Sequence, residues 1–436
     1  MKKILLPSVR AVLPDKKEPE ICDILIDIES SLIEKIGKNL TKEKECVFLK
    51  EFEGLTVFPG FIDPHVHFRT PGKTDAEDWL HASKAALSAG VTTVLDMPNN
   101  NPPVIDMASY ENKKKIISDK SLVNFGLFAA LTPSNSDELK KIETIKGIKV
   151  YMASTTGNIL IEDISKIDAK EGGLLFAFHA EDEPTIRENE KRFEGEFTPL
   201  AHTEIRSEEA AVKAVKKVID LQKKTGGNFH VCHVSVADEL DLLKNTPISH
   251  EVCAHHLFAD TSHYETGGFL WKCNPPLRKP QTREKLLDSL YQEDIEMIAT
   301  DHAPHLLSEK VKKEGMPPSG VPSIEAGTHL VLNEIFSGKI NYDYAAKILS
   351  SNAAKRFNIR NRGQIREGFF ADIAVIEEKK WIFSKNDVFS KCGWNPFEGL
   401  KLRAKVTASF VNGTLYRREN LSKIQKRDSF ANIFEV

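Results

Sequence analysis

The feature that most constrains this chain is a regular alternation of short apolar runs with longer amphipathic segments. From about Leu55 onward the runs are rich in β-branched and aromatic residues, which favour strands. In chain order they are LTVFPGFI, VTTVLDM, LVNFGLFAAL, GIKVYM, LLFAFH, NFHVCHV, SHEVCA and IEMIATD. Strands that alternate with helices form a parallel sheet, and eight such units are the number that closes a barrel. We therefore predict an α/β fold with a (β/α)8 TIM-type barrel.

Both ends of the chain carry a different pattern. Residues 1–57 and 363–436 hold short strand-like pieces, such as DILIDI, ADIAVI and KVTASFVNG, with turn signals and no strong helix. We expect these two parts to pair into one small composite β-sandwich domain beside a barrel of residues 58–362. The last stretch, ENLSKIQKRDSFANIFEV, carries no motif and has no predicted place.

The charge balance and the cysteines narrow the choice of partners. With 60 basic and 63 acidic residues the formal net charge is -3, so no field exists to hold nucleic acid or an anionic membrane. The six cysteines show no CxxC spacing, which favours reduced thiols, and no run approaches the 18 apolar residues of a membrane span. We expect a cytoplasmic protein that acts on a small molecule. We also expect a homodimer, because this is the most common assembly of soluble proteins that form oligomers.

The motif DPHVHF, which ends the first strand, is the strongest chemical signal. Side chains two positions apart on a strand point to the same side, so His65 and His67 should face the barrel interior together. Neutral imidazoles paired in this way are ready metal ligands. The motif alone does not separate a metal pair from two structural histidines.

Polar residues also end three other predicted strands. His179 closes the fifth run, His233 the sixth and Asp301 the eighth. Because barrel enzymes place their active sites at the carboxyl ends of the strands, we predict that these side chains converge with the first pair on a metal site. Three nearby histidines stay outside this prediction, one as structural and two unassigned: His230, His255 and His256.

Lys149 lies inside the fourth run, among apolar neighbours that favour an uncharged amine. Such an amine can take up carbon dioxide as a carbamate, whose two oxygens could bridge two metal ions. The alternative is a lysine whose ammonium group reaches the rim. Two ions, with zinc expected for histidine-rich ligation, would activate a shared hydroxide, and Asp301 could take and return its proton. The predicted reaction class is hydrolysis of a carbon–nitrogen bond.

The order of these motifs resembles the dihydroorotase branch of the amidohydrolase superfamily over nearly the whole chain. The matching stretches are GFIDPHVHFRTPG, AGVTTVLDMPNN, GIKVYM, HAED, HVCHVS, KCNPPLR, ATDHAPH and PSGVPSIE. The resemblance implies reversible cyclisation of N-carbamoyl-L-aspartate to L-dihydroorotate, a step of pyrimidine (UMP) synthesis. It also implies two zinc ions per chain.

The resemblance assigns a role to each candidate residue. Carboxylated Lys149 would bridge the two ions, and Asp301 would be both a ligand and the general acid and base. The remaining metal ligands would be His65, His67, His179 and His233. The side chains on the substrate would be Arg69, Asn99 and His305 at its carboxylate and Asn274 near its ring. A mobile segment that closes on substrate is expected at Thr155, Thr156 and Gly157, and the chain departs from the family pattern at Thr70, Asn100 and Ala254.

Two alternatives stay open. Another cyclic amidase, such as an allantoinase or a dihydropyrimidinase, would share the barrel, metals and lysine but open a different ring. The arginine that follows the HxH motif favours a substrate with its own carboxylate. A catalytically inactive dihydroorotase-like subunit would only scaffold a partner such as aspartate transcarbamoylase, and the complete ligand set argues against it.

Overall fold

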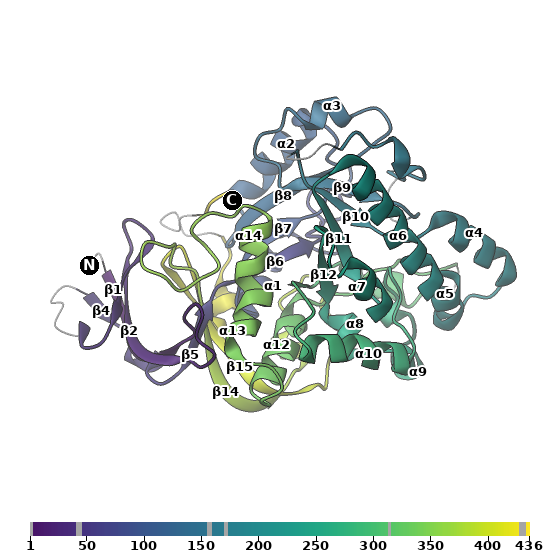
Figure 1. Ribbon diagram of the computed structural model, residues 1–436. Coiled ribbons are helices and arrows are strands. Elements are labelled where there is room, and N and C mark those ends of the chain that lie inside the picture. Colours follow the sequence, from purple (N-terminus) through teal and green to yellow (C-terminus); the bar gives the residue numbers. More distant parts are fainter. Residues whose placement is uncertain (1–2, 41–45, 155–158, 170–172, 313–314, 427–432) are drawn as a thin grey trace.

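The computed structural model describes residues 3–40, 46–154, 159–169, 173–312, 315–426 and 433–436. Thr155, Thr156 and Gly157, where a closing segment was expected, lie outside these residues. A barrel and a second sheet at its side, here called the smaller sheet because it forms the smaller of the two domains, make up the fold (Figure 1). Among the described residues no helix is both long and apolar enough to cross a membrane.

Eight parallel strands follow one another around the barrel in sequence order. A bridge between Val66 and His302 joins the last strand's end to the first, and the His67 amide donates to the His302 carbonyl at 2.8 Å. The predicted α/β barrel is confirmed. Its strands are β6 (Phe61–Val66), β7 (Val91–Asp96), β8 (Asn124–Ala130), β9 (Gly147–Tyr151), β10 (Phe176–His179), β11 (Phe229–Val234), β12 (Ser249–Cys253) and β13 (Ile298–Ala299).

The first predicted run divides between the two sheets. Its first half is β5 (Thr56–Pro59), which pairs with a strand of the smaller sheet and crosses the expected boundary at residues 57 and 58. Gly60 separates β5 from β6, and a Cβ atom there would lie 2.2 Å from Oγ1 of Thr92, so only glycine fits. The first barrel strand is therefore β6, which contains His65, and His67 follows it directly.

Helices surround the barrel (Figure 1). The longest, α6, begins after Ser207, whose side chain accepts from the amide of Ala210, and ends at Gly226 with a φ of 67°. Its buried face includes Val215 and Val218, as its apolar spacing requires. The helices are α1 (Trp79–Ser88), α2 (Met107–Ser118), α3 (Ser136–Leu139), α4 (Glu183–Arg192), α5 (Pro199–Ile205), α6 (Glu208–Thr225), α7 (Ala237–Leu243), α8 (Ala254–Phe258), α9 (Tyr264–Gly267), α10 (Pro280–Tyr291), α11 (Leu307–Lys310), α12 (Ile324–Ile335), α13 (Tyr342–Ala346) and α14 (Asn352–Arg356).

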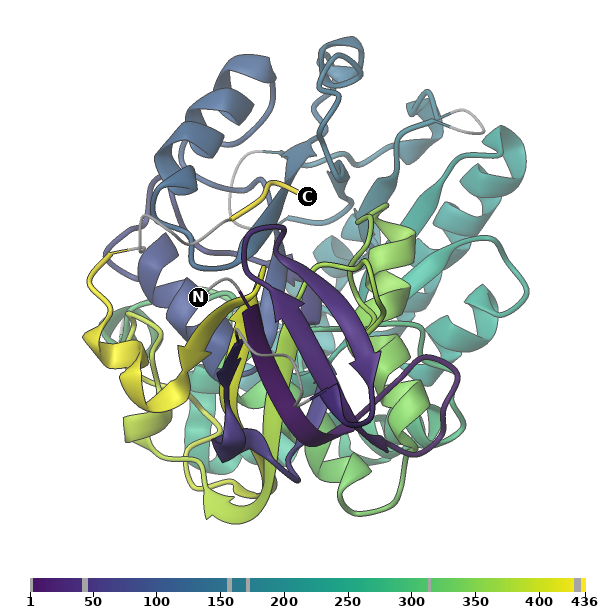
Figure 2. The ribbon, with the colours of Figure 1, turned by 90° about the vertical axis from the view of Figure 1, so that its left-hand side faces the viewer.

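The smaller sheet is built from both ends of the chain, as predicted. Its strand order is β16-β15-β14-β5-β1-β2-β3, with β4 paired to β1, and the two ends meet where β5 runs antiparallel to β14. Figure 2 shows the early and late strands, purple and yellow, side by side. The remaining strands are β1 (Lys3–Ala11), β2 (Glu20–Asp27), β3 (Leu32–Gly37), β4 (Cys46–Phe48), β14 (Ile373–Ile382), β15 (Lys401–Val411) and β16 (Thr414–Arg417).

Residues 433–436, from the stretch without a predicted place, lie along β8. The amide of Val436 donates to the Phe125 carbonyl at 2.9 Å, and the amide of Phe125 donates to the Phe434 carbonyl at 3.1 Å. The carboxylate of Glu435 accepts from the Tyr110 hydroxyl. This stretch therefore adds a short strand-like segment to the barrel wall.

Candidate active site

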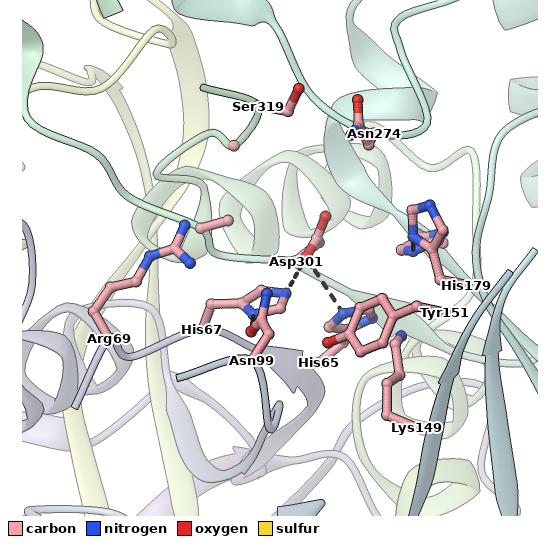
Figure 3. Close-up of a pocket in the computed structure, with 13 residues that line it drawn as sticks. His65, His67, Arg69, Asn99, Lys149, Tyr151, His179, Asn274, Asp301 and Ser319 are labelled. Carbon is pink, nitrogen blue, oxygen red and sulfur yellow. Dashed lines mark hydrogen bonds and ion pairs between the residues drawn. The ribbon is translucent and has the colours of Figure 1, made fainter. Parts of the chain in front are cut away.

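A pocket lies at the carboxyl ends of the barrel strands (Figure 3). The structure places nine of the ten predicted site residues on its wall. They are His65, His67, Arg69, Asn99, Lys149, His179, His233, Asn274 and Asp301. The tenth, His305, is fully buried behind Arg69, with its Nε2 atom 3.2 Å from Nη2 of that arginine.

The first pair of histidines faces Asp301. Nε2 of His67 lies 3.0 Å, and Nε2 of His65 3.4 Å, from Oδ1 of Asp301. Their other ring nitrogens have partners of their own, because Nδ1 of His65 lies 2.5 Å from Glu251 and Nδ1 of His67 lies 2.6 Å from Asn99. A neutral imidazole that donates through one nitrogen presents a lone pair on the other. The nitrogens that can bind a metal are therefore the ones that face the pocket.

In the second pair, the side chains of His179 and His233 face each other. Nδ1 of His179 lies 2.8 Å from Nε2 of His233, while Nε2 of His179 lies 2.8 Å from a carboxylate oxygen of Glu181. Burial opposes the ionisation of Glu181, but the charge of Arg206 and the His179 contact outweigh burial and lower the pKa of Glu181 to about 2. A carboxylate behind one histidine is the usual support of a metal ligand.

Lys149 is 1% exposed, and its surroundings do not balance a positive charge. Its Nζ atom lies 2.8 Å from Sγ of Cys232 and 5.6 Å from the ring centroid of Tyr151. Across the described residues no carboxylate forms an ion pair with it. A carbamate formed on Nζ would carry a negative charge in this pocket, which bound metal ions would balance.

Protonation at the site suits metal binding. Burial lowers the pKa of His65 to about 4, and burial together with His179 holds the pKa of His233 well below its usual value. Burial acts to raise the pKa of Asp301, but the two facing rings hold it well below the usual range. At neutral pH the imidazoles of His65 and His233 are thus neutral and Asp301 is ionised, which are the forms that ligate metals.

Three pocket residues adopt left-handed backbone conformations. The φ angles are 58° at Arg69, 37° at His233 and 45° at Asp301. Few non-glycine residues occupy this region, and those that do cluster at functional sites, where the surrounding structure holds them. Each strand end is therefore bent to direct a side chain into the pocket.

The sequence did not single out Glu251, although it organises the site. Its carboxylate accepts from His65, from Nε2 of His230 at 3.1 Å and from the amide of His233 at 3.3 Å. His230, predicted as structural, thus holds the residue that orients a metal ligand. The sequence signal that could have identified Glu251 is the presence of an acidic residue inside the predicted strand SHEVCA. Tyr151, whose buried hydroxyl has no hydrogen-bond partner in the described structure, is a second pocket residue that was missed.

Thr70 and Asn100, two of the residues that depart from the family pattern, contact each other. Nδ2 of Asn100 donates to the carbonyl of Thr70 at 3.1 Å, and Oδ1 of Asn100 accepts from Nζ of Lys113 at 2.6 Å. Lys113 in turn pairs with buried Asp96 at 2.5 Å. This network braces the segment that carries Arg69. The third departure, Ala254, is the first residue of α8.

Candidate ligand atoms within 4.8 Å of one another form three buried groups in the described structure. The first contains His65, His67 and Asp301, which are three of the six predicted ligands, and its donors fit a divalent ion such as zinc. The other two are His65 with Cys232 and Glu251, and Cys253 with His255 and His256.

Comparisons with known proteins agree with this geometry. Residues 56–416 match the amidohydrolase family. The chain is 32% identical to a dihydroorotase of Methanosarcina mazei over 416 residues, which cover 90% of this chain and 89% of the relative. It is 33% identical to a dihydroorotase of Pyrococcus horikoshii over 410 residues, covering 92% and 90%.

Solved structures show the same architecture. An L-hydantoinase (dihydropyrimidinase) from Arthrobacter aurescens superposes with a TM-score of 0.88 at 22% identity, covering 95% of this chain and 96% of that one. A dihydropyrimidinase from Brevibacillus agri gives a TM-score of 0.88 at 23% identity, covering 99% and 98%. At these identities the similarity shows the fold alone.

Proposed function

The chain belongs to the amidohydrolase family, and we propose that it is a zinc-dependent dihydroorotase of cytoplasmic pyrimidine synthesis. The observation that carries the proposal is one pocket in which Arg69 stands beside the complete predicted ligand set. The dihydroorotases among its relatives support the same substrate.

The metal-binding roles follow from the donors that face the pocket. We propose that His65, His67 and Asp301 hold one ion, that His179 and His233 hold the second, and that carboxylated Lys149 bridges them. When bound, two zinc ions would supply a nucleophilic water near neutral pH and polarise the ring amide carbonyl.

Asp301 is the residue that would move the proton. Its carboxylate is ionised, and its side chain is only 11% exposed, so a proton that it accepts is not lost to bulk water. In the hydrolytic direction it would take the proton of the attacking water and deliver it to the departing ring nitrogen. In the direction of ring closure it would act in reverse.

Arg69 would bind the substrate carboxylate. Its Nε donates to the Pro304 carbonyl at 3.0 Å, which fixes the guanidinium while its terminal nitrogens remain near the pocket. Two parallel donors match the two oxygens of a carboxylate. Nε2 of His305 lies 3.0 Å from the carbonyl of Ser319 and 3.2 Å from Nη2 of Arg69, and it can donate to the first or accept from the second but not both; we propose that it acts through Arg69 by packing behind the guanidinium. Asn274, held by His202 at 2.9 Å, would face the ring.

The first experiment follows the dihydroorotate absorbance band with zinc-replete protein, in both directions, at slightly acidic and slightly alkaline pH. Ring closure consumes a proton, so we expect closure at the lower pH and opening at the higher. Opening of dihydrouracil or a hydantoin without any reaction of dihydroorotate would replace the substrate and keep the reaction class. Inactivity toward all of them, with no metal bound, would favour a scaffold that associates with a partner such as aspartate transcarbamoylase.

A further inference from the structure

A second group of metal-type side chains lies where β12 passes into α8. The strand ends at Cys253, and the helix that starts at Ala254 carries His255 and His256 in its first turn. The three side chains are 0%, 1% and 3% exposed. They are absent from the pocket wall, so the proposed catalytic chemistry does not use them.

Ring nitrogens in this group lack partners. Within the described structure neither nitrogen of His255 has a hydrogen bond, and neither does Nδ1 of His256. Nε2 of His256 lies 3.0 Å from the carbonyl of Pro275, which can only accept, so Nε2 carries the proton and Nδ1 presents a bare lone pair. A buried polar atom left without a hydrogen-bond partner destabilises the fold. Such a group requires an explanation.

We propose that Cys253, His255 and His256 bind a thiophilic d10 metal ion, Zn²⁺ or Cu⁺, at a site separate from the catalytic pocket. Their ligand atoms lie within 4.8 Å of one another, so a point exists within about 2.8 Å of all three. Zinc bonds are about 2.3 Å to sulfur and about 2.0–2.1 Å to nitrogen, so an inward shift of less than about 1 Å would complete the site. On binding, the thiol of Cys253 releases its proton and the sulfur bonds to the ion.

The donors indicate which ions fit. One thiolate with two imidazoles and no carboxylate favours soft ions over Mg²⁺ or Ca²⁺. A univalent ion would give a neutral complex, which suits a fully buried position. Zn²⁺ would leave the complex with one positive charge. The carboxylate of Asp301 could balance it, because its charge acts on the rings of both His255 and His256.

The contact with Pro275 gives the site a structural role. A metal-bound histidine usually donates its other ring N–H to a carbonyl or carboxylate, and His256 has this arrangement already. Pro275 directly follows Asn274, which lines the pocket. An ion at this site would therefore hold the Asn274 segment in place from behind.

The test uses the full chain purified without chelators. Cys253→Ser, which preserves size, is compared with the wild type and with Cys232→Ser, a matched buried cysteine from the group containing His65 and Glu251. Bound metals are identified and counted by elemental mass spectrometry, which distinguishes zinc from copper. Cd²⁺ is then titrated into metal-free protein, and the ultraviolet charge-transfer band of cadmium thiolate is recorded.

We expect the wild type and Cys232→Ser to show the cadmium band, and Cys253→Ser to lose it together with one metal ion per chain. Retention of the band in Cys253→Ser, or its loss only in Cys232→Ser, would overturn the proposal. If Cys253→Ser does not fold, as judged by circular dichroism, His255→Gln replaces it in the same comparison. His255→Gln should bind one metal ion fewer, and an unchanged metal count would overturn the site.

Discussion

Replacing Glu251 by glutamine tests how the site is organised, because it removes one charge behind a metal ligand and preserves the size of the side chain. Oε1 of Glu251 accepts from His65 at 2.5 Å, and Oε2 accepts from His230 at 3.1 Å. Burial acts to raise the pKa of Glu251, but the two rings lower it far below its usual range, so the carboxylate is ionised at neutral pH. A neutral amide loses the charge-assisted part of both hydrogen bonds.

The expected size of the effect follows from the role of His65. Loss of the group that orients a metal-binding histidine typically weakens metal affinity by about 10–100-fold. At about 1.36 kcal/mol per tenfold change, this is about 1.4–2.7 kcal/mol. We therefore expect the zinc Kd of Glu251→Gln to rise by about 10–100-fold, and kcat to recover when zinc is saturating.

The assay is competition for zinc against a chromophoric chelator, with kcat measured across the same zinc range. Glu325→Gln is the matched control, because Glu325 is equally buried but accepts from the amides of Phe389 and Ser390, both at 2.8 Å, away from the pocket. It should lower Tm without changing the zinc Kd. If Glu251→Gln binds zinc as tightly as the wild type, Glu251 does not orient His65 for a metal.

The remaining predictions address the bridge, the substrate carboxylate and acid stability. Lys149→Ala should lose activity and regain part of it with small carboxylates such as acetate, and full activity without any added carboxylate would remove Lys149 from the site. Arg69→Lys should raise KM for dihydroorotate by about 10–100-fold, with a smaller change in kcat. Lysine would lose one of the two parallel hydrogen bonds to the substrate carboxylate, and one such bond is worth about 1.5–3 kcal/mol. An unchanged KM would contradict the proposed role of Arg69. Burial lowers the pKa of several histidines, His302 among them to about 4, so these groups leave metal-free protein fully stable above about pH 6.5 and destabilise it as pH falls from 6.5 toward 4. Burial raises the pKa of some carboxyl groups, such as that of Glu77 to about 7, and these groups stabilise the folded state as the pH falls from 7 to 4.5. They are fewer than the histidines. Calorimetry of the metal-free protein in EDTA should show Tm falling as the pH is lowered from 6.5 to 4. A Tm that stays constant would show that the histidines do not outweigh the carboxyls.

The sequence predicted the barrel and most of the pocket because both depend on local signals. A strand alternates with a helix within a few dozen residues, and a histidine at a strand end, such as His179, is visible without knowing its neighbours. Glu251 was missed because its partner His65 lies 186 positions away, and only the pairing of the barrel strands brings them together. The division of the first run at Gly60 was missed for the same reason, since the atoms that require glycine belong to Thr92.

Strands from the two ends of the chain share one sheet, which sets an order for folding during synthesis. The first strands pair with one another as soon as they are made, but Val57 of β5 pairs with Val375, so the outer edge of β5 has no partner until more than three hundred further residues have been translated. At roughly 5–20 residues per second this takes roughly 15–60 s. Chains stalled on the ribosome before β14 should therefore be cut by protease at β5, and those stalled after β15 should resist. The edge of β5, the strand that leads into the barrel's first strand, stays open until β14 arrives, and during that interval chaperones have access to it.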